Sequence, residues 1–181
     1  MDNPDPDRQR LEALLDKAEI AELLRRRARA ADRRDLDLAL SCYHRDATED
    51  HSGFVGPAAD FVRQAPSGDA DHQVKDMWHG LGPTLIELDG DSALAETYYL
   101  ALVTMDVRGQ LHEAMAAGRY VDRLVREDRT WLIFKRTVIF DWSRVDPSGE
   151  KFWDARGMDR TRLHFGAPAP WDMVYQESAR S

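Results

Sequence analysis

Residues 77–105, "MWHGLGPTLIELDGDSALAETYYLALVTM", decide the fold class. Two stretches rich in β-branched and aromatic residues flank "DGD" at 89–91, and an Asp-Gly pair in that setting is a strong signal for a β-hairpin. Similar stretches follow at 114–127 and 130–142, separated by short polar turns at "RGQ" (108–110) and "EDR" (127–129). Four long strands joined by short turns predict one curved, mostly antiparallel sheet.

The chain before this region has the periodicity of helices. Residues 1–7 are rich in Pro and Asp and are expected to be disordered. "DKAE" at 16–19 resembles a capping box, after which one apolar stripe continues. The residues of that stripe are Ile20, Leu23, Leu24, Ala28 and Ala31. Two further short helices are expected within 35–44 and 56–66, the second with Pro57 in its first turn and Pro66 beyond its end.

Three N-terminal helices followed by a long β-meander predict an α+β fold with the helices on one face of the sheet. Three helices over a strongly bent sheet form a cone, and its interior is the expected pocket. The 181 residues fit one domain, assigned to 8–145. Residues 146–181 are expected to form a C-terminal extension that packs on the sheet or on a neighbouring subunit.

Composition excludes several function classes. The net charge of −8 disfavours nucleic acid as a partner, because nucleic-acid binders present a basic face. Cys42 is the single cysteine, so no intramolecular disulfide can form and a reducing compartment is expected. No apolar run approaches the length of a membrane span, and the N-terminus has no signal-peptide core, so the prediction is a cytoplasmic protein with no membrane partner.

No cofactor or metal is expected. The six histidines show no metal-ligand spacing, and "LHEAM" lacks the second histidine of a zinc helix. "GLG" at 80–82 is too short for a dinucleotide fingerprint, and neither a P-loop nor a G-x-S-x-G motif is present.

Three polar residues interrupt apolar rows that should face the same interior. On a helical wheel Arg27 lies near the centre of the first helix's apolar stripe, and Asp32 lies at the edge of that stripe where the helix ends. Read by twos, the last strand places Arg136 in a row of apolar side chains, and the first places His79 in another. Taken alone, Arg27 could extend its charge to the rim, and His79 could be a buried core residue.

Their coincidence favours a pocket. Burying an isolated charge costs several kcal/mol, so two inward arginines need anionic partners. Asp32 can supply one negative charge, and an anion of the ligand or of the reaction is expected to supply the other. Phe54, Met77 and Met115 are candidates to line the pocket, and Tyr98 or Tyr99 could add a phenol donor. Tyr98 and Tyr99 alternate faces, so at most one can point inward.

Three stretches also resemble a known family. They are "ADRRDLDLALSCYHRDA", "WHGLGPTLIELDGDSALAETYY" and "GRYVDRLVREDRTWLIFKRTVIFDWSRV". Over residues 15–145 the sequence is similar to the SnoaL-like branch of the NTF2-like superfamily, in particular to its scytalone dehydratase, hexachlorocyclohexane dehydrochlorinase and bile-acid 7α-dehydratase group. The resemblance implies an α+β cone, often trimeric, with an Asp–His dyad at Asp32 and His79. The resemblance also matches Arg136 to the arginine that relatives carry on their final strand. At Arg27 the sequence departs from the lysine or tyrosine of relatives.

The resulting hypothesis is a lyase without a cofactor. Asp32 orients His79, and His79 removes a proton from carbon, after which water or another group leaves a small, mostly apolar cyclic substrate. Arg136 and Arg27 stabilise the developing anion. The alternatives are an isomerase, a protein that binds a small molecule without converting it, and a structural subunit. A homo-oligomer, trimer or dimer, is expected.

Overall fold

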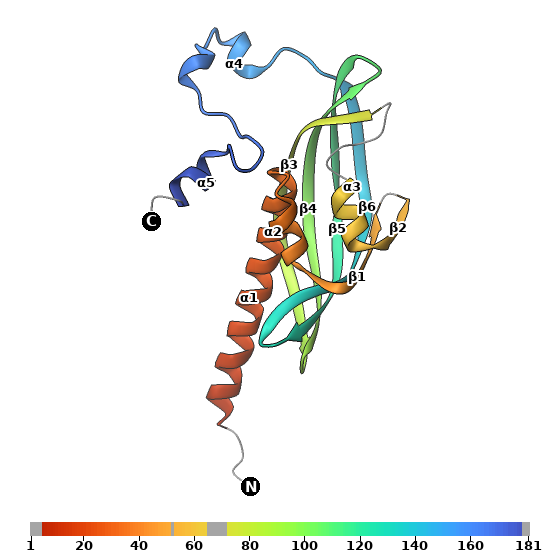
Figure 1. The fold of residues 1–181 in the computed structure, drawn as a ribbon, viewed down its shortest axis with the longest axis vertical. Coiled ribbons are helices and arrows are strands. Elements are labelled where there is room, and N and C mark those ends of the chain that lie inside the picture. Colours follow the sequence, from red (N-terminus) through yellow and green to blue (C-terminus); the bar gives the residue numbers. More distant parts are fainter. Residues whose placement is uncertain (1–4, 52, 65–71, 179–181) are drawn as a thin grey trace.

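The computed structural model describes residues 5–51, 53–64 and 72–178. One long helix lies along a tall, curved sheet, and two short helices lie beside the middle part of the sheet (Figure 1). The α+β class and the curved, mostly antiparallel sheet agree with the prediction. Among the described residues, no helix is both long and apolar enough to cross a membrane.

The β-meander is confirmed. It consists of β3 (His72–Asp89), β4 (Ser92–Val107), β5 (Gln110–Glu127) and β6 (Thr130–Pro147), each antiparallel to the next. All three turns contain residues with positive φ, as tight hairpins require. The residues concerned are Gly90, Arg108, Gly109, Asp128 and Arg129. The segment between residue 64 and β3 lies outside the described residues.

Two strands were not predicted. β1 (Tyr43–His51) follows α2 (Leu36–Ser41), and β2 (Phe54–Pro57) precedes α3 (Ala58–Gln64). The sheet order is β2-β1-β6-β5-β4-β3, with β1 parallel to β6. The expected arrangement of three helices before the first strand is therefore wrong, because one long helix and one short helix precede β1. The sequence of β1, "YHRDATEDH", is too polar to show an apolar alternation.

Helix α1 (Pro6–Asp32) begins earlier than expected. Asp5 caps it by accepting a hydrogen bond from the backbone N–H of Asp7, so the described part of the expected disordered N-terminus starts the helix. The proposed capping box at Asp16 is wrong, since α1 continues through it. Asp16 instead accepts hydrogen bonds from the side chains of Arg126 and Trp131, which tie α1 to the sheet.

The two faces of the sheet differ sharply. Side chains alternate along β4, with Ala93, Ala95, Thr97, Tyr99 and Ala101 buried and their neighbours more exposed. The buried row faces α1, whose side chains Ile20, Leu23 and Leu24 complete the core with α2 and α3. We call this helix-covered side the inner face and the opposite side the outer face.

A bulge at Gly118 brings β5 and β6 close together. The register shifts between Ala117 and Gly118, and a Cβ at Gly118 would lie 1.9 Å from the carbonyl oxygen of Ile139. No side chain fits there, so glycine is required for the two strands to bend toward each other.

The C-terminal segment returns to the end of α1. After β6 it passes through α4 (Phe152–Ala155), the short helix η1 (Arg160–Arg162) and α5 (Met173–Ser178), and Figure 1 shows α5 beside the C-terminal end of α1. Asp172 pairs with Arg33 at 2.8 Å, and Tyr175 donates to Asp35 at 2.8 Å. Its packing on a neighbouring subunit stays a prediction.

Candidate functional site

Asp32 and His79 form a hydrogen-bonded pair. Asp32 is the last residue of α1, and His79 lies on the inner face of β3, opposite Ala101 of β4. Nδ1 of the His79 ring lies 2.6 Å from one Asp32 oxygen, and the His79 backbone N–H donates to the other at 3.2 Å. Both side chains are largely buried, with 9% of Asp32 and 16% of His79 exposed. With Asp32 ionised, Nδ1 carries the hydrogen, and Nε2 is the nitrogen that can exchange a proton.

A large cavity opens beside Asp32. It has a volume of about 1060 Å³ and lies between the end of α1, β3 and the segment 148–168. Asp32 and Met77 both line it, together with Trp153 and Phe165. A small molecule could therefore approach Asp32 from the side that the C-terminal segment encloses.

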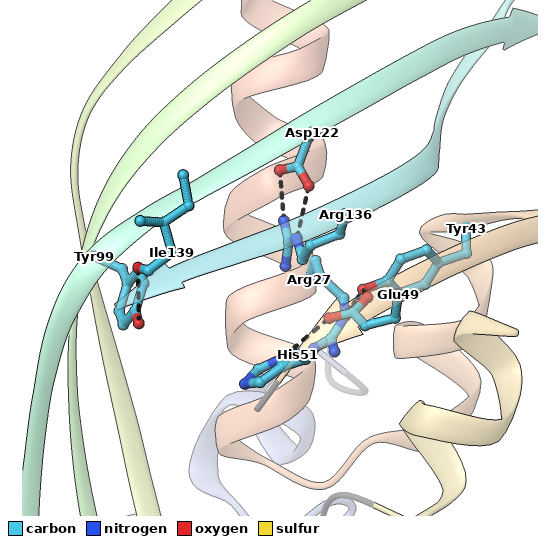
Figure 2. A network of polar contacts seen from close by, with 8 residues as sticks. All are labelled: Arg27, Tyr43, Glu49, His51, Tyr99, Asp122, Arg136 and Ile139. Atoms are coloured by element: carbon cyan, nitrogen blue, oxygen red, sulfur yellow. Dashed lines mark hydrogen bonds and ion pairs between the residues drawn. The ribbon is translucent and has the colours of Figure 1, made fainter. Parts of the chain in front are cut away.

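Arg136 is held by a carboxylate of the neighbouring strand. Its Nε and Nη2 donate to the two oxygens of Asp122 at 2.7 and 2.8 Å, and both side chains are buried (Figure 2). The guanidinium also lies over the ring of Tyr120, 4.3 Å from its centroid. Burial alone would lower the pKa of Arg136, but the charge and hydrogen bonds of Asp122 outweigh it and raise that pKa well above its usual value.

Arg27 reaches a second carboxylate through a phenol. Its Nε donates to the hydroxyl of Tyr43 at 3.0 Å, and that hydroxyl donates to Glu49 at 2.6 Å (Figure 2). Glu49 is only 1% exposed. Burial would raise the pKa of Glu49, but a hydrogen bond from His51, the charges of Arg136 and Arg27 and the Tyr43 hydroxyl lower it overall.

These contacts correct one expectation about the arginines. Both face inward as predicted, and burial of both is confirmed. Their counter-charges are Asp122 and Glu49 of the chain itself, so neither Asp32 nor an anionic ligand is needed to balance them.

An aromatic cluster adjoins Glu49. The His51 ring stacks on Phe61 at 4.5 Å between centroids, and Phe61 lies 5.5 Å from Phe54. Phe140 meets His51 edge-on at 5.9 Å and Tyr99 at 6.4 Å. The structure thus brings the predicted Phe54 to an apolar, aromatic surface next to the buried charges.

Two other predicted residues lie elsewhere. Tyr98 and Met115 are on the outer face, 54% and 38% exposed, because each alternates with an inner-face neighbour. Tyr99 is the inward tyrosine. It is 5% exposed and stacks on Tyr120 with centroids 4.4 Å apart, and burial raises its pKa to about 12. Met115 belongs to a separate outer-face hollow of about 470 Å³ with Trp78, Leu102 and Trp142.

Sequence reasoning missed Glu49, His51 and Asp122. Asp122 carried a usable signal, because it interrupts the inward row of Tyr120 and Leu124 just as Arg136 interrupts its own row. Glu49 and His51 carried none, since β1 itself was not recognised as a strand. Among the described residues, no three His, Cys, Asp or Glu side chains are grouped so that they could hold a metal ion.

Known proteins resemble this chain over most of its length. The profile of the SnoaL-like domain matches residues 12–137, whereas no curated protein matches the sequence. The hexachlorocyclohexane dehydrochlorinase LinA-type3 from Novosphingobium barchaimii is 22% identical with a TM-score of 0.66, covering 78% of this chain and 97% of that one. A protein of Kribbella flavida is 21% identical with a TM-score of 0.63, covering 73% of this chain and 95% of that one.

An NTF2-like protein with a cystatin-like fold from Novosphingobium aromaticivorans is also similar. It is 24% identical with a TM-score of 0.57, and the match covers 78% of this chain and 92% of that one. At these identities the solved structures establish a shared fold and leave the reaction open.

Proposed function

This chain belongs to the SnoaL-like domain family, and we propose that it is a cofactor-independent lyase that eliminates water or another leaving group from a small, mostly apolar cyclic substrate. The observation that carries the proposal is the 2.6 Å contact between the His79 ring and Asp32, a residue that lines a large cavity. An imidazole fixed by a carboxylate is a suitable general base. A dehydrochlorinase with the same fold, itself an elimination enzyme by name, adds support.

Each residue has a distinct role in the proposed reaction. Nε2 of His79 takes a proton from a carbon next to an electron-withdrawing group, and the C–H electrons form the new double bond as the leaving group departs. Asp32 holds the ring and stabilises the imidazolium that forms. Arg136, already paired with Asp122, stays outside the proton transfer and stabilises developing negative charge from a distance.

The aromatic surface of Phe61, Phe140 and Tyr99 fits an apolar ring. Flat aromatic side chains bury apolar area and impose an orientation on a cyclic ligand. Phe140 is 47% exposed on the inner face, so a ligand has access to it.

The test is elimination from a panel of cyclic β-hydroxy ketones, followed by the ultraviolet absorbance of the enone product. We expect His79→Gln to lower kcat by at least about 100-fold, the usual contribution of a general base, and Asp32→Asn to lower it less. His112→Gln, on the exposed β4–β5 hairpin, is the matched control and should leave kcat unchanged. Wild-type turnover in either His79→Gln or Asp32→Asn would refute the mechanism. Saturable binding without product would identify a binding protein, and a shifted double bond an isomerase.

A homo-oligomer stays a prediction of the sequence. The outer face of the sheet presents exposed apolar side chains that could pair with another copy, namely Trp78, Leu100, Leu102, Met115 and Trp142.

A further inference from the structure

His51 is the last residue of β1, and its side chain is more exposed than the inner-face side chains that precede it on this strand. Tyr43, Ala47 and Glu49 precede it on the same inner face, and each of these three is buried. The side chain of His51 is 25% exposed, against 1% for Glu49. The carboxylate is therefore enclosed behind the ring, and the ring is the part of this row that a ligand can reach.

The contacts of Glu49 fix how His51 presents its nitrogens. Nδ1 of His51 lies 3.3 Å from Glu49, whose other oxygen accepts from Tyr43. The surrounding positive charges and hydrogen bonds keep Glu49 ionised, and an ionised carboxylate can only accept. Nδ1 therefore carries a hydrogen, and Nε2 is the nitrogen through which His51 can exchange a proton.

His51 and His79 belong to the same inner face. His79 pairs with Ala101, which pairs with Ala116 and, through it, with Ser143. The next inner rung contains Leu81, Tyr99, Gly118 and Phe140, and Phe140 touches His51. The small side chains of the two alanines lie next to His79, while aromatic rings lie next to His51.

The two histidines have different electrostatic surroundings. Asp32 contacts both the ring and the backbone N–H of His79. Glu49 is instead part of a buried group in which two arginines, Arg27 and Arg136, balance Glu49 and Asp122. His51 is held through Nδ1 by Glu49 of this group, which leaves Nε2 as the nitrogen that can donate a proton on the same face as the base His79.

We propose that His51 is a second catalytic residue, the general acid that protonates the leaving group, and that the substrate class is therefore cyclic alcohols with an activated neighbouring C–H. The proposal rests on the proposed elimination at His79. As His79 removes the proton from carbon, the C–O bond breaks and Nε2 of protonated His51 gives its proton to the departing oxygen, which leaves as water. One proton is gained at His79 and one lost at His51, and exchange with solvent resets both. Chloride leaves without protonation, so such an acid would be superfluous in a dehydrochlorinase.

Two ketones that differ in the leaving group test this assignment. 3-Hydroxycyclohexanone and 3-(4-nitrophenoxy)cyclohexanone both yield cyclohexenone, but nitrophenolate departs without an acid. We expect His51→Gln to slow the hydroxy ketone about 100-fold or more and the nitrophenoxy ketone less than about threefold, with His112→Gln unchanged on both. Equal slowing of both substrates, or of neither, would overturn the role of His51. Undiminished activity of His79→Gln on both ketones would instead refute the proposed lyase mechanism.

Histidine-ring NMR provides a second readout that needs no turnover. Addition of 2-cyclohexenone, the common product, should shift the ring signals of His51 and His79 along one saturation curve, with His51→Gln and His79→Gln assigning the peaks. A shift of His79 alone would overturn the role of His51 and leave the lyase proposal intact. Absence of a shift at both histidines would contradict both proposals.

Discussion

Arg136 and Arg27 are both buried on the inner face, but their charges are balanced in different ways. Arg136 makes two direct hydrogen bonds to Asp122, so its ion pair is closed within two neighbouring strands. Arg27 contacts Tyr43, and the carboxylate of Glu49 lies one hydrogen bond further on, next to His51. Among the described residues, the Arg136–Asp122 pair has no hydrogen bond with an accessible side chain, whereas the Arg27–Tyr43–Glu49 group contacts the partly exposed ring of His51. The difference indicates that Arg136 mainly secures the sheet and that Arg27 supports the site.

The largest loss of stability should follow from removing one partner of the Arg136–Asp122 ion pair. Asp122→Leu leaves Arg136 charged and buried without its carboxylate, and removing one partner of such a pair costs about 3–5 kcal/mol. Urea denaturation followed by circular dichroism would measure this loss. The double variant Asp122→Leu/Arg136→Met should recover most of it, because apolar side chains of similar volume can replace a buried pair.

A more solvent-accessible ion pair on the outer face provides the control for that experiment. Arg119 contacts Glu96 at 2.8 Å, and Glu96 is 35% exposed. Glu96→Gln should leave the urea midpoint nearly unchanged, because exposed ion pairs contribute little. If Asp122→Leu behaved like Glu96→Gln, the closed pair would not be what secures β5 to β6.

A smaller loss of stability is expected when the Tyr43 hydroxyl, which connects Arg27 to Glu49, is removed. Tyr43→Phe removes one hydroxyl that both accepts from Arg27 and donates to Glu49, and unsatisfied buried groups cost about 1–3 kcal/mol. Tyr98→Phe, which removes an exposed hydroxyl from the outer face, is the matched control. Equal urea midpoints for the two variants would show that Arg27 and Glu49 do not depend on Tyr43.

The same contrast explains what the sequence could and could not predict. Arg136 and Arg27 were recognisable because each interrupts an apolar row in an element with clear periodicity. The meander was predictable because its turns and alternation are local signals. Asp32 and His79 were found partly through position and partly through family resemblance, and the structure places them in contact.

The failures concentrate on β1. Its inner row includes Tyr43, Glu49 and His51, so the alternation that reveals a strand is replaced by polar residues. Glu49 is held ionised there by Arg27 and Arg136, which come from α1 and β6, together with His51 and Tyr43 of its own strand, and the approach of the two arginines is not encoded locally. A strand that contributes polar residues to a site lacks the apolar alternation by which strands are recognised, so sequence patterns fail to identify it.

The smallest expected effect is a pH dependence of the unfolding free energy that comes from Glu49. Its pKa is lowered in the folded protein, against about 4.3 for an unperturbed glutamate. Its contribution is therefore fully present above the unfolded value and is lost as the pH falls through the lower, folded value. The difference in unfolding free energy between wild type and Glu49→Gln should stay constant from pH 7 to about 5 and shrink below about 4. Urea titrations of both proteins at each pH would measure it, and the other carboxylates cancel because the two chains share them. A difference that stayed constant down to about pH 3 would mean that Glu49 is not held ionised by its neighbours, and the arrangement behind His51 would lose its basis.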